Sequence, residues 1–336
     1  MTTVGREYDA HGLTPSDSHA DGARTYGDPM ETAQTGAVST STPFSAGTAT
    51  VGVVGLGIMG SAMSGHLVAA GFAVVGRDVV PAAIEELVRR GGRGAPDVAS
   101  VAREADVVVT SLPSPQAALE VCREIASAGR EGLVVVETST LSVAVKQECH
   151  DLLAPAGVTL LDCPLSGTGA QAQERDLVVL GSGDEAAFER ARPVMDAFAR
   201  SVRHVGPFGN GMTMKLVANL LVSIHNASTA EAFALGVAAG LDPDVLYETI
   251  REGAGGSVIF DKRGPLMAKR TYRPATAKVS MFQKDVSLVQ ELAASVGVPT
   301  PVLDATLPLY DRAAETGWAD ADAAALLEVL NEGKQA

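Results

Sequence analysis

Lys215 is the strongest candidate for a catalytic residue, because it is an ionisable side chain in a mostly apolar segment, residues 209–240. At about 100° per residue, Asn219, Ser223 and Asn226 fall within roughly 80° of it around a helix, so a narrow polar stripe is expected there. Burial lowers the pKa of a lysine, which suits a general acid/base near neutral pH. The alternative is a lysine whose stem lies on apolar surface while its ammonium reaches water.

Three glycines, Gly55, Gly57 and Gly60, follow the apolar run 51–54 with the spacing GxGxxG. In a strand–turn–helix unit, the first glycine permits a tight turn, the second lets the backbone approach a pyrophosphate, and the third allows close packing of helix on strand. The helix N-terminus then faces the anion. In a chain with 35 glycines the same spacing also fits an ordinary turn. Whether the glycines form a nucleotide-binding loop therefore depends on a strand before them and a helix after them.

Asp78 lies about 20 residues after these glycines, at the end of the next apolar run. A carboxylate there accepts hydrogen bonds from the adenosine ribose of NAD and would repel the 2′-phosphate of NADP. The neighbouring Arg77 could soften this preference, so NADP also fits. The alternative for Asp78 is a helix cap.

Other candidate contacts follow expected strands whose carboxyl ends meet at one edge of the sheet, where open α/β sheets bind ligands. Leu112 and Pro113 could enclose a ring, and Thr140 could hydrogen-bond a carboxamide or a ribose. Ordinary strand-to-helix turns with a Ser or Thr cap explain these residues equally well.

A glycine-rich loop, residues 162–169, carries Ser166, Gly167 and Thr168. Backbone N–H groups and hydroxyls of such a loop can hold a carboxylate without a full positive charge, although a plain turn has the same composition. Further on, Lys284 and Asp285 place two charges in an apolar helical pattern. That pair fits either an anion contact or a surface ion pair.

The composition limits the classes of function. The chain has 336 residues, 46% of them hydrophobic and 20% charged, and a formal net charge of −14. This charge argues against nucleic acid and anionic membranes as partners. Because the sequence has no run of 18 apolar residues, no secretory signal, and three cysteines without metal-ligand spacing, we expect a cytoplasmic protein with reduced thiols and no metal.

The elements that must position these residues follow from hydrophobic periodicity. Apolar strands that alternate with helices predict a Rossmann-like α/β domain, with a doubly wound and mostly parallel sheet, over residues 49–208. This context favours a nucleotide site at the glycines. The expected strands are 50–55, 73–78, 106–111, 133–137, 158–162, 176–180 and 202–205, and the expected helices are 58–70, 81–90, 115–128, 143–153 and 185–199.

Two further regions flank this domain. Residues 1–48 are expected to form a disordered tail, because they can bury little apolar surface. Residues 209–333 are expected to form an all-α substrate and dimerisation domain that starts with one long buried helix, 209–240. The later expected helices are 242–251, 257–270 in pieces, 278–295, 300–315 and 320–330.

Together these residues resemble the β-hydroxyacid dehydrogenase family, the group around 3-hydroxyisobutyrate dehydrogenase, from about Thr50 to Leu330. Four motifs occur in the family's order. Val-Val-Gly-Leu-Gly-Ile-Met-Gly (53–60) resembles the cofactor motif, and Asp-Cys-Pro-Leu-Ser-Gly (162–167) resembles the substrate motif. Gly-Asn-Gly-Met-Thr-Met-Lys-Leu-Val-Ala-Asn (209–219) resembles the catalytic motif, and Lys-Asp (284–285) the C-terminal cofactor motif.

The resemblance implies a role for each matching residue. Lys215 would be the catalytic acid/base, and Asn219, one helical turn later on the same face, would orient the substrate. Ser166, Gly167 and Thr168 would bind the substrate carboxylate. The residues implied to contact NAD or NADP are Gly55, Gly57, Ile58, Met59, Gly60, Arg77, Asp78, Leu112, Pro113, Thr140 and Lys284.

Three departures from the family pattern favour a substrate larger or more polar than 3-hydroxyisobutyrate, such as threonate. Thr168 replaces a usual glycine, and Ala218 replaces the first residue of a common Asn-Asn pair. Lys278 lies close to a position where a pocket-lining phenylalanine is missing.

The predicted function is NAD(P)-dependent oxidation of a β-hydroxy acid, with Lys215 as general acid/base. One alternative is reduction of a small aldehyde or imine on the same scaffold, although imine reductases tend to lack this lysine. An alternative from another class is a non-catalytic dinucleotide-binding interaction module. The apolar surface of segment 209–240 predicts a homodimer or homotetramer.

Overall fold

The computed structural model describes residues 42–128 and 130–332, so most of the tail expected over 1–48 lies outside the described residues. Residues 42–48 are described, and for them the expectation of disorder is wrong. Phe44 is buried, its N–H donates to the carbonyl of Arg190 at 2.9 Å, and the guanidinium of Arg190 lies 4.8 Å from the Phe44 ring centre. One covered aromatic ring thus fixes the end of this segment to the fold.

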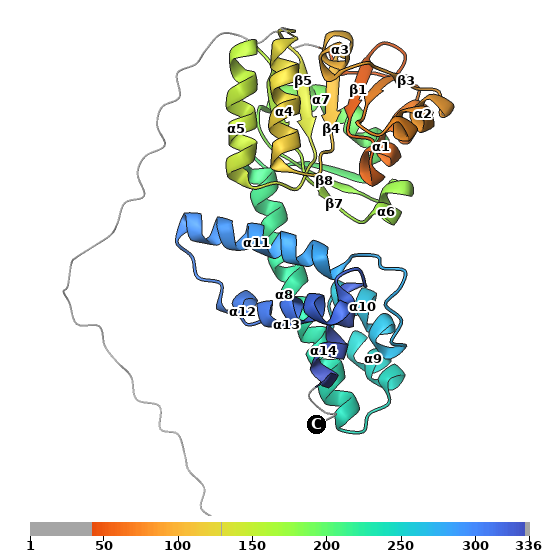
Figure 1. Cartoon of the computed structure of the whole chain (residues 1–336), viewed down its shortest axis with the longest axis vertical. Helices are drawn as coiled ribbons and strands as arrows, with labels where there is room; N and C mark the ends of the chain where they lie inside the picture. The colour runs from red at the N-terminus through yellow and green to blue at the C-terminus, as the bar shows by residue number, and fades with distance from the viewer. Residues whose placement is uncertain (1–41, 129, 333–336) are drawn as a thin grey trace, which may run out of the picture. The chain divides into compact units, whose positions relative to one another are not determined.

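A six-stranded sheet, parallel throughout, forms the first half of the described chain (Figure 1). Its strands are β1 (Thr50–Val54), β2 (Ala73–Arg77), β3 (Arg93–Gly94), β4 (Val107–Thr110), β5 (Val134–Glu137) and β6 (Thr159–Asp162). The spatial order β3-β2-β1-β4-β5-β6 reverses the winding between β1 and β4. Ligands of open α/β sheets bind outside the carboxyl ends of strands at such a reversal. The predicted doubly wound fold is confirmed.

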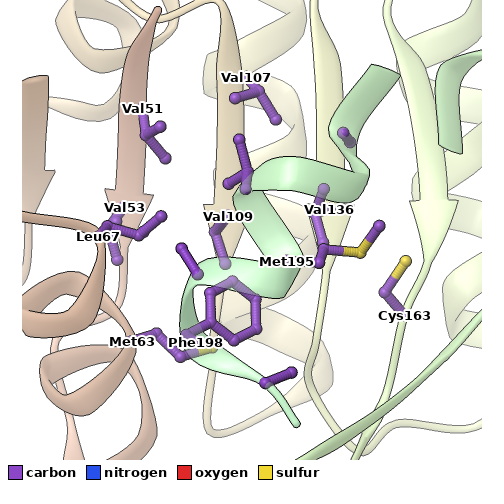
Figure 2. Close-up of a cluster of buried hydrophobic side chains, with 14 of the residues drawn as sticks. Val51, Val53, Met63, Leu67, Val107, Val109, Val136, Cys163, Met195 and Phe198 are labelled. Atoms are coloured by element: carbon purple, nitrogen blue, oxygen red, sulfur yellow. The ribbon is translucent and has the colours of Figure 1, made fainter. Parts of the chain in front are cut away.

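Helices cover both faces of this sheet because its strands are apolar on both sides. Val107 and Val109 face a cluster that includes α1 and α7, as Figure 2 shows, whereas Val108 faces a cluster with α3, α4 and α5. All three valines are fully buried, as expected of parallel strands covered on both faces. The covering helices are α1 (Ile58–Ala69), α2 (Pro81–Arg89), α3 (Val98–Glu104), α4 (Pro115–Ser127), α5 (Val143–Leu153) and α7 (Glu185–Phe198).

The last strands of the α/β half form a second sheet, although we expected them to extend the first. In it β7 (Leu165–Ser166) pairs antiparallel with β8 (Val178–Gly181), which pairs parallel with β9 (Ser201–His204). The backbones of Asp162 and Ser182 exchange hydrogen bonds of 2.8 and 3.0 Å. This bridge fixes the second sheet at the carboxyl end of β6.

The second half is helical, as the sequence predicts. Its elements are α8 (Asn210–Ala238), α9 (Pro243–Arg251), α10 (Val258–Ala268), α11 (Val279–Val296), α12 (Pro301–Asp304), α13 (Leu307–Ala313), η2 (Ala314–Trp318), η3 (Ala323–Ala325) and α14 (Leu326–Glu332). The segment expected in pieces, α10, is one helix, and the single helix expected over 300–315 is divided. No helix within the described parts of the chain is long and apolar enough to cross a membrane.

Helix α8 is buried along one side and exposed along the other. Near its start, Met212 and Leu216 pack against residues of α11 and α12, and near its end Phe233 lies in the core of the helical half. On the opposite side, Val217 and Leu221 are 51% and 49% exposed. The expectation of one long buried helix is therefore met on one side of α8, and the other side is exposed in a single chain.

Candidate active site

The glycine loop between β1 and α1 has the geometry that its spacing predicts. Gly55 has φ +88°, and a Cβ on Gly60 would lie 1.8 Å from the carbonyl oxygen of Gly55, so α1 packs directly on the turn. Gly57 is exposed at the N-terminus of α1, and a Cβ there would meet nothing within 4 Å. The two outer glycines thus serve the turn, and the open side of Gly57 fits a pyrophosphate at the helix N-terminus.

Asp78 follows β2 and touches the same loop. One carboxylate oxygen accepts the N–H of Leu56 at 2.5 Å, and the other accepts the N–H of Val80 at 2.8 Å. Asp78 therefore holds the backbone of two loops, but it does not cap α2, whose N-cap residue is Val80. An ionised carboxylate has about four acceptor sites, so this role leaves room for ribose hydroxyls. The guanidinium of the neighbouring Arg77 donates to the Asp78 carbonyl.

Lys215 lies on the second turn of α8, and its ammonium donates to the carbonyl oxygen of Leu165, next to Ser166. The lysine of the helix thus meets the loop that was expected to bind a carboxylate. Burial lowers the pKa of Lys215, Asp285 opposes this shift, and the positive charges of Lys146 and Lys284 add to it. The lowered pKa favours an uncharged amine, the form in which a lysine can accept a proton.

Asn219 and Asp285 connect Lys215 to α11. The side-chain amide of Asn219 donates to a carboxylate oxygen of Asp285 at 3.0 Å. Burial raises the pKa of Asp285, and the nearby Lys215 and Lys284 oppose this rise. Asp285 is half-buried, while Lys284 is exposed, so the two neighbours are not simply a surface ion pair.

The rest of the polar stripe on α8 belongs to the core of the helical half. The hydroxyl of Tyr310 donates to the carbonyl of Ser223 at 2.9 Å. The amide of the buried Asn226 donates to the Tyr310 hydroxyl at 3.2 Å and to the carbonyl of Ala323 at 3.0 Å. Within the polar stripe, Asn219 bonds Asp285, whose charge acts on Lys215, whereas Ser223 and Asn226 have partners in the core of the helical half.

Ser166, the last residue of β7, and Gly167, which follows it, are both exposed. Gly167 has φ +143°, and a Cβ there would lie 2.6 Å from a methyl carbon of Leu177. Thr168 is already engaged: its hydroxyl accepts the N–H of Gln171, whose side chain accepts the N–H of Thr168. This capping box starts the short helix α6 (Gly169–Gln173), for which no helix was predicted from the sequence.

The remaining expected cofactor contacts lie at the carboxyl ends of strands or in the helical half. Ile58 is 75% exposed at the start of α1, next to the half-buried Met59. Leu112 follows β4, and its N–H donates to the hydroxyl of Ser139 at 2.8 Å. Pro113 is exposed, Thr140 after β5 is half-buried, and Lys284 lies on α11.

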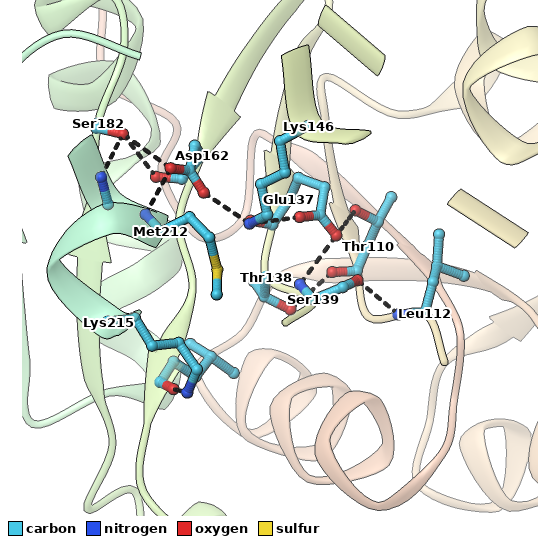
Figure 3. A network of polar contacts seen from close by, with 12 residues as sticks. Thr110, Leu112, Glu137, Thr138, Ser139, Lys146, Asp162, Ser182, Met212 and Lys215 are labelled. Carbon is cyan, nitrogen blue, oxygen red and sulfur yellow. Dashed lines mark hydrogen bonds and ion pairs between the residues drawn. The ribbon is translucent and has the colours of Figure 1, made fainter. Parts of the chain in front are cut away.

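A buried charged cluster behind these strand ends was not foreseen (Figure 3). The ammonium of Lys146, on α5, lies 2.6 Å from Asp162 and 2.7 Å from Glu137, and all three side chains are buried. The available signal was that Glu137 and Asp162 each end a buried, mostly apolar strand, where an ionised group requires a partner. Among the described residues, no three His, Cys, Asp or Glu side chains are grouped to hold a metal ion.

Two sequence families match the chain in succession. The family described as the NAD binding domain of 6-phosphogluconate dehydrogenase matches residues 50–206. The family described as NAD-binding of NADP-dependent 3-hydroxyisobutyrate dehydrogenase matches residues 209–330.

Individual proteins align over nearly the same length. Glyoxylate/succinic semialdehyde reductase 2 of Arabidopsis thaliana is 32% identical and aligns over 86% of this chain and 81% of its own. L-threonate dehydrogenase of Pectobacterium atrosepticum is 32% identical over 84% of this chain and 94% of its own. The structure of Mycobacterium tuberculosis 3-hydroxyisobutyrate dehydrogenase with L-serine superimposes with a TM-score of 0.79, at 29% identity, over 84% of this chain and 99% of its own.

The fold, the glycine loop and these matches define an NAD(P)-dependent hydroxyacid dehydrogenase. The chain belongs to the β-hydroxyacid dehydrogenase family, and the resemblance stated from its motifs is confirmed.

Proposed function

We propose that the chain oxidises a β-hydroxy acid to the corresponding oxo acid, with NAD as the preferred cofactor and Lys215 as general acid/base. The observation that carries this proposal is the hydrogen bond from the Lys215 ammonium to the carbonyl of Leu165, because it joins the lysine to the loop of Ser166 and Gly167. A general base has to lie within hydrogen-bonding reach of the proton it removes.

On this proposal, the cofactor is held by the glycine loop at its pyrophosphate and by Asp78 at its ribose. The further cofactor contacts are Ile58, Met59, Arg77, Leu112, Pro113, Thr140 and Lys284. Bound NAD would supply the hydride acceptor for the hydroxyl-bearing carbon of the substrate. The acidic Asp78 is the reason to prefer NAD over NADP.

The chain's own groups handle the substrate and its proton. The hydroxyl of Ser166 and the N–H groups around Gly167 bind the carboxylate, and Asn219 orients the substrate hydroxyl. The uncharged amine of Lys215 accepts the hydroxyl proton during oxidation, and its ammonium returns a proton during reduction. The lowered pKa of Lys215 makes the uncharged form available closer to neutral pH.

For the substrate we propose a hydroxylated acid of the threonate type. The support is the 32% identity to an L-threonate dehydrogenase over most of both chains. The two polar departures from the family pattern, Thr168 and Lys278, give this substrate less support than expected from the sequence. The Thr168 hydroxyl caps α6, and the Lys278 ammonium lies 2.8 Å from Asp320 at the surface.

Reduction of a small aldehyde is the second candidate, because the reductase from Arabidopsis thaliana is equally similar. The residues proposed to bind the hydroxy acid would also bind the aldehyde, and Lys215 would donate the proton. A substrate panel separates the dehydrogenase from the reductase. It measures turnover of 3-hydroxyisobutyrate, L-threonate and L-serine with NAD and NADP, and of glyoxylate and succinic semialdehyde with NADH and NADPH. Faster turnover of the aldehydes at equal concentrations would favour the reductase, and no turnover of any of them would overturn both.

We also propose that the exposed side of α8 is a subunit contact in a homodimer or homotetramer. Met214, Val217 and Leu221 are each about half exposed, and their spacing puts them on one face of the helix. A location in the cytoplasm remains a prediction; the free thiols of Cys122, Cys149 and Cys163 are buried and fit a reducing compartment.

A further inference from the structure

The charged cluster behind the active site has an unusual composition for a protein interior. Lys146 is fully buried, and its ammonium contacts Asp162 at 2.6 Å and Glu137 at 2.7 Å. Burial alone would lower the pKa of Lys146, but the two carboxylates raise it above its usual range, so the lysine is charged. One ammonium between two carboxylates leaves one negative charge in the cluster.

That excess negative charge faces the start of α8. The second carboxylate oxygen of Asp162 accepts the N–H of Met212 at 2.7 Å, in the first turn of the helix that carries Lys215. A carboxylate at a helix N-terminus is stabilised by the unpaired N–H groups there. The contact is close, because a Cβ on Gly211 would lie 2.6 Å from the carbonyl oxygen of Asp162.

Ser182 reinforces the same junction. Its hydroxyl accepts the N–H of Gly211 at 2.9 Å and lies 3.2 Å from the carboxylate of Asp162. The first two N–H groups that follow Asn210 in α8 are therefore both held by side chains from the end of the sheets. Because Lys215 lies in the next turn of the same helix, these contacts also bear on its position.

Glu137 extends the cluster toward the cofactor side. Its carboxylate accepts the N–H of Ser139 at 2.9 Å, and the hydroxyl of Ser139 accepts the N–H of Leu112 at 2.8 Å. Figure 3 shows this chain of contacts running from Leu112 through Glu137 and Lys146 to Asp162 and Met212. Lys146 contacts both carboxylates and so connects the contacts of Glu137 with those of Asp162.

Stability alone does not explain such a cluster, because well-packed apolar residues are often at least as stable as a buried ion pair. We propose that Lys146 is a positioning residue, which ties the loops at the ends of β4 and β5 to the helix that carries Lys215. The inference rests on the proposed role of Lys215 and adds a residue to it that the sequence motifs do not include.

Lys146 also acts on Lys215 through its charge. The charged groups that bear on Lys215 are Asp285 and Lys284 from α11 and Lys146 from α5. Removal of the Lys146 charge removes a repulsion and leaves the two carboxylates less neutralised. Both changes favour the ammonium form of Lys215 and raise its pKa.

The test compares Lys146→Met with a control that breaks another buried ion pair, Arg263→Met. Arg263 lies 2.9 Å from Asp322 in the helical half, with 6% and 0% of the two side chains exposed. We expect Lys146→Met to lower kcat about 10- to 100-fold, the cost of a displaced catalytic group. We expect Arg263→Met to lower the melting temperature similarly, with kcat within about twofold of the wild type.

A second readout needs neither substrate nor cofactor. The pH dependence of Lys215 acetylation by acetic anhydride, followed by mass spectrometry on the cofactor-free protein, reports the pKa of this amine. Its midpoint should move to higher pH in Lys146→Met and stay in place in Arg263→Met. An unchanged kcat and midpoint in a folded Lys146→Met, or equal changes in Arg263→Met, would overturn the inference.

If Lys146→Met does not fold, the double variant Lys146→Met/Glu137→Gln replaces it, because it keeps the net charge of the cluster while cutting the link. It should show the loss of kcat with a smaller shift of the midpoint, and a kcat within about twofold of the wild type would overturn the inference. Failure of the proposed function is recognised separately, by a Lys215→Met variant that retains turnover. If Lys215→Met is inactive and the Lys146 variants are normal, only the positioning role is wrong.

Discussion

The side-chain amide of Asn219 lies 3.0 Å from a carboxylate oxygen of Asp285 and so joins the helix of Lys215 to the helix of Lys284. This contact holds a half-buried carboxylate beside two lysines. Burial lowers the pKa of Lys215, and Asp285 is the group that opposes the shift. The working pH range of the proposed base is therefore set by a balance: burial, Lys146 and Lys284 lower the pKa of Lys215, and Asp285 opposes them.

Asp285→Asn should shift this balance in a defined direction. Loss of the negative charge destabilises the ammonium of Lys215 and lowers its pKa further. Because oxidation requires the uncharged amine, the ascending limb of kcat/KM against pH should move to lower pH. Glu291→Gln, at an exposed position of the same helix, should leave the limb in place. Movement of the limb to higher pH in Asp285→Asn would contradict the assignment.

Alanine at two glycines of the loop should separate folding from cofactor binding. Gly60→Ala puts a methyl 1.8 Å from the Gly55 carbonyl and should destabilise the cofactor-free protein by about 1–3 kcal/mol or more. Gly57→Ala meets open space at φ −65° and should change the free energy of unfolding by less than about 0.5 kcal/mol.

NADH fluorescence titration completes this comparison. Gly57→Ala should weaken NADH binding about tenfold, or roughly 1.4 kcal/mol, because its methyl takes the place of the pyrophosphate. Normal NADH affinity in a folded Gly57→Ala would show that the pyrophosphate does not lie there.

Thr168→Ala should act mainly through helix α6. Loss of the capping box should lower the free energy of unfolding by about 1 kcal/mol, measured by denaturant unfolding. Thr168→Ser keeps the capping hydroxyl and should restore most of this stability. A large rise of KM in Thr168→Ala, restored by Thr168→Ser without any change in stability, would instead place the hydroxyl on the substrate.

Leu221→Glu should weaken subunit association, because it puts a charge on the exposed apolar side of α8, where Leu221 is 49% exposed. Light scattering should show a smaller assembly than for the wild type. Val88→Glu alters a valine that is 51% exposed on α2 and should not change the assembly. A monomeric wild type would contradict the proposed subunit contact.

Periodicity and spacing predicted much of this structure because they report local physics. The valine runs 107–109 and 134–136 are buried on both faces of a parallel sheet, and the three glycines adopt the expected turn. Helix α8 was expected over residues 209–240 and runs from Asn210 to Ala238. These features depend on residues close together in sequence.

The features not predicted from the sequence are short elements, an ion pair between distant residues, and polar contacts that compete with ligand binding. The short elements β3, β7 and α6 have too few residues to show a period. Lys146 is 16 positions from Asp162, so its ion pair has no spacing signature. The capping role of Thr168 and the pairing of Lys278 with Asp320 compete with the substrate contacts that motif comparison implied.

The most direct test of the account is turnover by Lys215→Met with the best hydroxy acid of the panel, together with NADH affinity. The account predicts a loss of turnover of about 10²- to 10⁴-fold, the usual contribution of a general acid/base, with NADH affinity within about twofold of the wild type. Turnover within about threefold of the wild type, in a folded variant that binds NADH normally, would contradict the role of Lys215 as the general acid/base.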